Sequence, residues 1–300
     1  MTKEFLVLTA PPGAGVLTAD LVGRIADTLA GATSPNVLGD AEAVEFGLSD
    51  TNETPGQDIK TAVQQCLCSA PVDINIVAAA ERHKQLLVAD MESTIIEQEC
   101  LDELADRLNL RNKISDITSR AMRGEIDFEP ALRERVSLLA GLPATSLQDV
   151  HDDVTLMPGA ATLLATLKQN NVFCGLVSGG FSFFADKIAA QLNFDACHCN
   201  QLEIEADHLT GKVIDPILGR EAKAARLQSW CDEKNLPAAE TLAVGDGSND
   251  LDMLKLSGMG VAFRAKPLVA DAADFSIVHG DLTALLYLQG YQAEEIQFKS

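Results

Sequence analysis

The chain has 300 residues, of which 47% are hydrophobic and 22% charged, an ordinary balance for a globular protein. This length is sufficient for two domains and a sizeable core. The net charge of −21 repels phosphate backbones and anionic membranes, so we expect neither a nucleic-acid nor a membrane partner. We find no signal peptide and no apolar run long enough to span a membrane, so we expect a cytoplasmic protein whose seven cysteines are reduced.

Residues 1–80 are predicted to form a small α+β domain. The expected elements are a strand at Phe5–Thr9, a helix at Thr18–Leu29, one or two strands within Val37–Leu48, a helix at Gln57–Cys68 and a strand at Val72–Val77. Thr18 is a candidate N-cap of the first helix. The order β-α-β-β-α-β is typical of a ferredoxin-like unit, and it resembles the ACT-type domains attached to amino-acid enzymes.

Residues 81–300 are predicted to form an α/β domain with a doubly wound parallel sheet. Three short apolar runs, each followed by a polar turn, indicate buried parallel strands: Leu86–Ala89, Val172–Val177 and Leu242–Val244. A mostly helical stretch separates the first run from the second. We therefore expect a helical cap, at about residues 95–155, inserted after the first strand and covering the active edge of the sheet.

Polar residues follow each of the three predicted strands, at the edge where doubly wound sheets bind ligands. In chain order they are Asp90–Thr94, Ser178–Phe181 and Gly245–Asp250, with Lys223 upstream of the last strand. A carboxylate can attack phosphorus while Mg²⁺ and a lysine neutralise the phosphate. A serine hydroxyl and glycine N–H groups can hold the phosphoryl oxygens, and a second acid can protonate the departing alkoxide and then activate water. These residues are therefore sufficient for phosphoryl transfer.

Each segment alone has a structural alternative. Asp90 could be a helix N-cap, and Ser178–Gly180 could be an ordinary turn. The acidic run 246–252 could be a calcium loop, but Leu251 occupies the position where such a loop needs glycine, and the run follows a strand rather than a helix.

Together the segments resemble the motifs of the haloacid dehalogenase-like superfamily, which has a Rossmann-like core, over about Leu86–Leu288. Its first motif, D-x-D-x-[TV], is similar to DMEST at 90–94. The resemblance implies that Asp90 is the nucleophile and a Mg²⁺ ligand. It implies that Glu92 is the general acid/base and binds the metal through its backbone carbonyl. The other implied roles are phosphoryl binding by Ser178 and Gly179, charge neutralisation by Lys223, metal binding by Asp246, and support of substrate and metal by Asn249 and Asp250.

Within that superfamily the chain is similar to the phosphoserine phosphatases. Phosphoserine carries an ammonium, which requires a buried acid, and a carboxylate, which an arginine can bind through two parallel hydrogen bonds. The family's acid after the first motif is matched by Glu99, and its cap signature is similar to Met122–Phe128 and Leu132–Leu139. By this match Arg135 would bind the carboxylate, and Phe128 would help to close the site. A salt bridge to a neighbouring residue or helix is the structural alternative for Arg135.

The implied reaction is the Mg²⁺-dependent hydrolysis of O-phospho-L-serine to L-serine and phosphate through a covalent aspartyl-phosphate, the last step of serine biosynthesis. Position 92 departs from the family, which usually has aspartate there. The extra methylene moves the carboxyl by roughly 1.5 Å, and a misplacement of about 1 Å can cost about a hundredfold in rate. Some phosphoserine phosphatases that also transfer phosphate to homoserine resemble this chain in having D-x-E.

Two alternatives to this function stay open. One is another small-molecule phosphomonoesterase or phosphotransferase, for example to homoserine. The other is a catalytically disabled amino-acid sensor, although Asp90, Ser178, Lys223 and Asp246 are all retained. A homodimer is a possible assembly.

Two pairs of cysteines lie close together in the sequence, at Cys66–Cys68 and Cys197–Cys199. Their spacing is not C-x2-C, and no second pair lies at a suitable distance for a zinc site. We therefore interpret all four as ordinary thiols.

Overall fold

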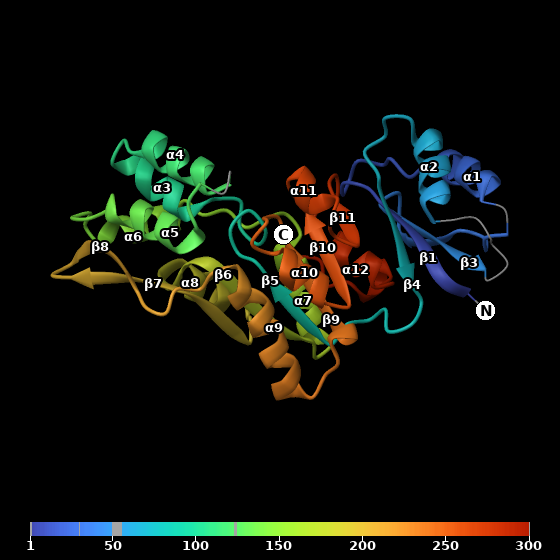
Figure 1. Ribbon diagram of the computed structural model, residues 1–300. Coiled ribbons are helices and arrows are strands. Elements are labelled where there is room, and N and C mark those ends of the chain that lie inside the picture. The colour runs from blue at the N-terminus through green and yellow to red at the C-terminus, as the bar shows by residue number, and fades with distance from the viewer. Residues whose placement is uncertain (1, 30, 50–55, 123–124, 300) are drawn as a thin grey trace.

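Two β-sheets and a group of helices make up the protein in a computed structural model that describes residues 2–29, 31–49, 56–122 and 125–299. The smaller sheet lies at one end of the molecule, the larger sheet in the middle, and a helical insertion at the other end (Figure 1). Within these ranges no helix combines the length and the apolar character that a membrane crossing requires.

The smaller sheet contains the first four strands. Its elements are β1 (Thr2–Thr9), α1 (Ala19–Thr28), β2 (Asn36–Gly39), β3 (Ala43–Ser49), α2 (Gly56–Leu67) and β4 (Asp73–Ala78). The strands pair antiparallel in the order β2-β3-β1-β4, and α1 and α2 pack on one face. The predicted order of elements is therefore confirmed, and the region Val37–Leu48 contains two strands that extend one residue beyond it at each end. Thr18 caps α1, since its hydroxyl accepts a hydrogen bond of 3.3 Å from the N–H of Leu21.

The larger sheet contains the remaining strands. They are β5 (Leu86–Ala89), β6 (Phe173–Phe181), β7 (Ala196–Glu205), β8 (His208–Ile214), β9 (Thr241–Gly245), β10 (Met259–Phe263) and β11 (Phe275–Ile277). Their order is β11-β10-β9-β5-β6-β7-β8, and every pair is parallel except β7 with β8. The predicted parallel sheet is confirmed, and the antiparallel hairpin at its edge is an addition to it.

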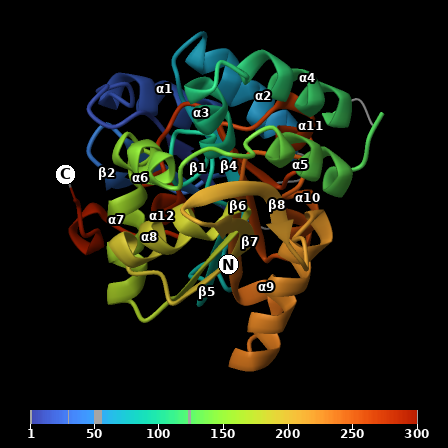
Figure 2. The ribbon, with the colours of Figure 1, turned by 90° about the vertical axis from the view of Figure 1, so that its left-hand side faces the viewer.

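Helices cover both faces of the larger sheet (Figure 2). They are α7 (Ala160–Gln169), α8 (Ser182–Leu192), α9 (Arg220–Lys234), α10 (Leu251–Leu256), α11 (Pro267–Ala270) and α12 (Ala284–Leu288). Alternate residues of β5 face opposite ways. Leu87 and Ala89 belong to the core that includes α7, α8 and α12, whereas Leu86 and Val88 belong to the core that includes α9 and α10. Burial on both faces explains why this strand is an unbroken apolar run.

The helical insertion, residues 97–155, lies between β5 and α7. It contains α3 (Cys100–Arg107), α4 (Arg111–Met122), α5 (Phe128–Ser137) and α6 (Thr145–Asp152). Its two ends meet, because the N–H of Glu97 donates to the carbonyl of Thr155 at 3.0 Å and the N–H of Met157 donates to that of Ile95 at 2.9 Å. Arg123 and Gly124 of the predicted cap signature lie outside the described residues.

The smaller sheet packs directly against the rest of the molecule. Val7 and Val77 share a core with Tyr287 of α12. The Asp73 carboxylate accepts hydrogen bonds from the backbone N–H groups of residues 278–280. The charged connector between the sheets is buried at Arg82, whose guanidinium lies 2.6 Å from the Glu45 carboxylate. The two sheets are therefore joined by a packed interface.

Candidate active site

Three aspartates converge at the carboxyl end of the larger sheet. Asp90 follows β5, and Asp246 and Asp250 follow β9, which pairs with β5 in parallel. Because parallel neighbours end at the same edge, these residues come together, with one oxygen of each carboxylate within 4.8 Å of the others. Asp90 and Asp250 are buried, and Asp246 is partly exposed.

Lys223, near the start of α9, joins two of these acids. Its ammonium lies 2.7 Å from the Asp90 carboxylate and 2.5 Å from that of Asp250, with all three side chains buried. Burial alone would lower the pKa of Lys223, but the charges of Asp250 and Asp90 outweigh it and raise that pKa. The lysine is therefore held in its charged form beside the acids.

One ammonium does not balance three carboxylates. Burial, and then the charge of Asp250, raise the pKa of Asp90 well above its usual range, although Lys223 acts in the opposite direction. The same two causes raise the pKa of Asp246 to about 6. A buried set of oxygen ligands with excess negative charge fits a hard divalent cation. The chain therefore provides a candidate metal site at Asp90, Asp246 and Asp250.

Glu92 lies between the sheet and the helical insertion. Its carboxylate accepts a hydrogen bond of 2.8 Å from the N–H of Cys100, in the first turn of α3. Gly180 leaves room for it, since a Cβ there would lie 2.9 Å from the second carboxylate oxygen. Burial, and then the charge of Glu99, raise the pKa of Glu92 to about 7. Such a carboxyl can both give and take a proton near neutral pH.

The segment Ser178–Gly180 lies at the end of β6 and is fixed by hydrogen bonds. The buried Ser178 hydroxyl accepts one of 2.9 Å from the N–H of Gly180, and the Asn200 amide donates one of 2.8 Å to the carbonyl of Gly179. A small cavity of about 10 Å³ is lined by Ser178, Gly179, Lys223 and Asn249 among others. The structure thus brings these four predicted residues together.

A larger cavity, of about 310 Å³, lies between the strand ends and the helical insertion. One wall includes Asp90, Glu92, Gly179, Asp246 and Asn249, and the other includes Glu99, Asp102, Thr118, Phe128 and Arg135. Motif matching did not single out four of the lining residues, which are Asp102, Thr118, Arg220 and Lys266. Asp102 lies three residues after Glu99, about one helical turn along α3, and this spacing is the signal that could have found it.

Arg135 lines this cavity and forms no ion pair with the described residues. It donates at 3.4 Å to the hydroxyl of Thr118 and to the carbonyl of Ala131. The neighbouring Arg133 instead pairs with Glu129 and Asp215 on the surface. The salt-bridge alternative for Arg135 is therefore not observed.

Glu99 lines the same cavity, but the expectation of a buried acid at this position is wrong. Its side chain is exposed, and the carboxylate accepts a hydrogen bond of 2.8 Å from the hydroxyl of Ser93. The reason is its position just before α3, at the rim where the insertion leaves the sheet.

A family model of haloacid dehalogenase-like hydrolases matches residues 87–255, more than half of the chain. The chain belongs to this family. The match covers the strands that carry Asp90, Ser178 and Asp246 together with the helical insertion. The expected family is therefore confirmed.

Relatives with assigned names point to one group of the family. The chain is 45% identical over 203 residues to a phosphoserine phosphatase of Lactococcus lactis, covering 68% of this chain and 94% of the relative. It is 41% identical over 257 residues to a phosphoserine phosphatase of Streptomyces coelicolor and 40% identical over 266 residues to phosphoserine phosphatase SerB2 of Mycobacterium tuberculosis. The matches cover 85% and 84% of this chain, and 62% and 64% of those two longer relatives.

Solved structures show the same fold. A haloacid dehalogenase family hydrolase of Salmonella enterica superposes with a TM-score of 0.85 at 26% identity, covering 96% of this chain and 98% of that one. A probable phosphoserine phosphatase of Vibrio cholerae gives 0.77 at 29% identity, covering 96% and 86%. A substrate-bound phosphoserine phosphatase gives 0.64 at 34% identity, covering 68% and 97%.

Proposed function

We propose that this protein is a phosphoserine phosphatase, which hydrolyses O-phospho-L-serine to L-serine and phosphate. The observation that carries the proposal is the larger cavity with its two unlike walls, beside the small cavity at Ser178 and Lys223. The strand ends supply acids, a lysine and glycine N–H groups suited to a phosphoryl group, and the insertion supplies Glu99 and Arg135. An amino acid esterified with phosphate has the charges to match both walls. The names of the relatives support the same substrate.

The proposal divides the chain into two domains. Residues 1–80 would form a ferredoxin-like, ACT-like domain, which the strand order β2-β3-β1-β4 supports. Residues 81–300 would form the phosphatase domain, with the helical insertion as a cap of about residues 95–155. The hydrogen bonds between the two ends of the insertion support a cap whose two connections to the rest of the domain lie side by side.

Mg²⁺ is the cation we propose for the candidate metal site, with Asp90, Asp246 and the backbone carbonyl of Glu92 as ligands and Asp250 in support. When bound, it would neutralise negative charge between the phosphate and the carboxylates. The excess negative charge of three aspartates beside one lysine supports this assignment.

In the proposed first half-reaction, a carboxylate oxygen of Asp90 attacks phosphorus, and the bond between phosphorus and the serine oxygen breaks. Glu92 gives its proton to that oxygen, so serine leaves with a neutral hydroxyl. In the second half-reaction Glu92 takes a proton from water as the water oxygen attacks phosphorus, which releases phosphate and restores Asp90. The pKa of Glu92 near 7 supports both proton transfers.

The remaining residues hold the substrate in this scheme. Ser178, the N–H of Gly179 and Lys223 would bind the phosphoryl oxygens, with Asn249 beside them. Arg135 would pair with the substrate carboxylate, Glu99 with its ammonium, and Phe128 would cover it. The absence of a competing ion pair at Arg135 among the described residues supports its role, because only Nε and Nη1 donate hydrogen bonds there and Nη2 remains available to a ligand.

We propose a cytoplasmic location, which the free state of all seven cysteines supports, because reduced thiols persist there. We also propose that the chain forms a homodimer, which light scattering would test. The outer strand β2 of the smaller sheet carries the exposed Val37, and such an edge can pair with a second chain.

The test of the function is phosphate release from a panel of esters in the presence of Mg²⁺. O-phosphoserine should be turned over faster than phosphothreonine, phosphoethanolamine and sugar phosphates. A preference for another ester, or transfer of phosphate to added homoserine in place of water, would replace the proposal with the corresponding phosphatase or transferase. Failure to trap a phosphorylated or beryllofluoride-bound Asp90 would favour a catalytically disabled sensor.

A further inference from the structure

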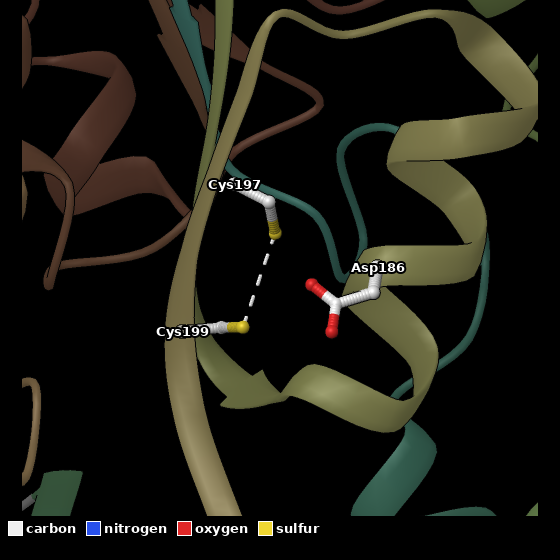
Figure 3. Close-up of side chains that lie close together, drawn as sticks. All are labelled: Asp186, Cys197 and Cys199. Carbon is white, nitrogen blue, oxygen red and sulfur yellow. Dashed lines mark hydrogen bonds between the residues drawn. The ribbon is translucent and has the colours of Figure 1, made fainter.

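A second cluster of metal-ligating side chains lies outside the candidate active site. Cys197 and Cys199 are on β7, and Asp186 is on α8, which packs beside that strand (Figure 3). The two sulfur atoms are 3.9 Å apart, and a carboxylate oxygen of Asp186 lies within 4.8 Å of both. Both thiols and the carboxylate point into the gap between strand and helix (Figure 3).

The strand geometry distinguishes a disulfide from a shared metal ion at this pair of thiols. Residues i and i+2 of a strand share one face, and their Cα atoms are about 6.6 Å apart. That spacing is near the upper limit of about 6.8 Å for a disulfide, and the two side chains leave the strand nearly parallel. Two thiolates bound to one tetrahedral zinc ion at about 2.3 Å each lie about 3.8 Å apart. The observed separation of 3.9 Å matches the metal-bound arrangement.

The donor set also suits such an ion. Two sulfur ligands select a soft or borderline metal over Mg²⁺, which prefers oxygen. The Asp186 carboxylate provides a third, anionic donor, and its side chain is exposed, so a water molecule can reach the fourth position. We propose that Asp186, Cys197 and Cys199 bind one Zn²⁺ ion, with water as the fourth ligand.

The spacing of the two cysteines alone predicts ordinary thiols, because the third donor comes from a different element of the fold. The ion would join α8 to β7, and both elements border the segment Ser178–Gly180. Helix α8 begins just after that segment, and Asn200, the residue after Cys199, donates to the carbonyl of Gly179. The site would therefore fix the position of this segment from two sides.

Cobalt is the probe that tests this site, because thiolate ligands give Co²⁺ a charge-transfer absorption in the near ultraviolet and oxygen ligands do not. The full chain, saturated with Mg²⁺ and kept reduced by a phosphine, is titrated with Co²⁺. We expect the absorption to rise to one equivalent and to disappear on addition of one equivalent of Zn²⁺. Absence of the absorption in the wild type overturns the proposal, whatever the candidate active site binds.

Three variants locate the signal. The double variant Cys197→Ser/Cys199→Ser should lose it. The matched variant Cys66→Ser/Cys68→Ser, which alters the other closely spaced pair, should retain it. Asp186→Asn changes only an exposed side chain and leaves both thiols in place. It should weaken Zn²⁺ binding at least about tenfold, because the loss of even an outer residue that orients a metal ligand typically costs that much. Retention of the absorption in the first variant, or unchanged affinity in the third, contradicts the assignment.

Discussion

The carboxylate of Glu92 accepts a hydrogen bond of 2.8 Å from the N–H of Cys100, and this bond links the end of β5 to the first turn of α3. The proposed acid/base is therefore positioned by the helical insertion as well as by the sheet. The longer glutamate side chain is what reaches the helix, because aspartate at the same position would be one methylene shorter.

Two substitutions of Glu92 separate its acidity from its reach. Glu92→Gln keeps the length but has no proton to give, so kcat should fall about a thousandfold. Glu92→Asp keeps the acid but withdraws it from Cys100, so kcat should fall about tenfold to a hundredfold. Steady-state phosphate release measures both, with Glu97→Gln on the exposed side of the same segment as the control. Wild-type turnover by both Glu92 variants would remove Glu92 from the mechanism.

Gly180 provides the space that Glu92 occupies. A Cβ at this position would lie 2.9 Å from the Glu92 carboxylate and 3.1 Å from the Ser178 hydroxyl. Gly180→Ala should therefore displace the acid and lower kcat about tenfold or more. The control is Gly23→Ala in α1, where a new Cβ meets no atom within 4 Å, so activity should stay unchanged. Equal activity of the two variants would show that the contact with Glu92 does not matter.

Arg135 and Arg133 are matched residues on one helix with different surroundings. Arg135→Lys keeps a positive charge but loses the two parallel donors, so KM for O-phosphoserine should rise about tenfold or more. KM for phosphoethanolamine, which has no carboxylate, should change little. Arg133→Lys alters only exposed pairs with Glu129 and Asp215 and should leave both constants unchanged. An equal rise for both esters would assign Arg135 a structural role.

The candidate metal site predicts a link between Mg²⁺ and stability. An ion that binds only the folded chain adds about 2.7 kcal/mol at a concentration a hundred times its Kd. Mg²⁺ should therefore raise the thermal unfolding midpoint of the wild type, and a chelator should reverse the rise. Asp246→Asn should abolish this response, whereas Asp252→Asn, at an exposed pair with Arg220, should preserve it. A full response from Asp246→Asn would place the ion elsewhere.

The buried pair of Arg82 and Glu45 joins the two sheets. Arg82→Ala would leave the Glu45 carboxylate buried without its partner, which typically costs about 3–5 kcal/mol. Urea denaturation should show this loss in a single transition, because the sheets share a packed core. Arg24→Ala, at an exposed pair with Asp20, should cost less than about 0.5 kcal/mol. Two separate transitions in the wild type would contradict a shared core.

The sequence predicts the centre of the larger sheet well and its edges poorly. Leu86–Ala89 is buried on both faces, so every residue is apolar and the strand is recognisable. Strand β7 is half-exposed and mixes cysteine, histidine and acidic residues, so it has no apolar run to detect. Strand β11 has only three residues, and no motif residue follows either β10 or β11. Strand β10 pairs with β9 and β11 pairs with β10, and a local sequence pattern does not contain these contacts.

The sequence predicts those site residues that come directly after a strand, such as Asp90 and Asp246. Two contacts of the site arise only from the tertiary fold. The ion pair of Lys223 with Asp250 joins α9 to the segment after β9, and the hydrogen bond from Cys100 to Glu92 joins α3 to the segment after β5. The exposure of Glu99 has the same origin, since it depends on where the insertion leaves the sheet.

The most direct test of the account is Mg²⁺-dependent phosphate release from O-phospho-L-serine by the wild type and by Asp90→Asn. Asparagine has nearly the same shape as aspartate but cannot serve as the nucleophile, and circular dichroism would check that the variant is folded. We predict sustained release by the wild type and a loss of at least about a thousandfold in Asp90→Asn. Comparable release by both proteins, or none by the wild type with Mg²⁺ present, would contradict the account.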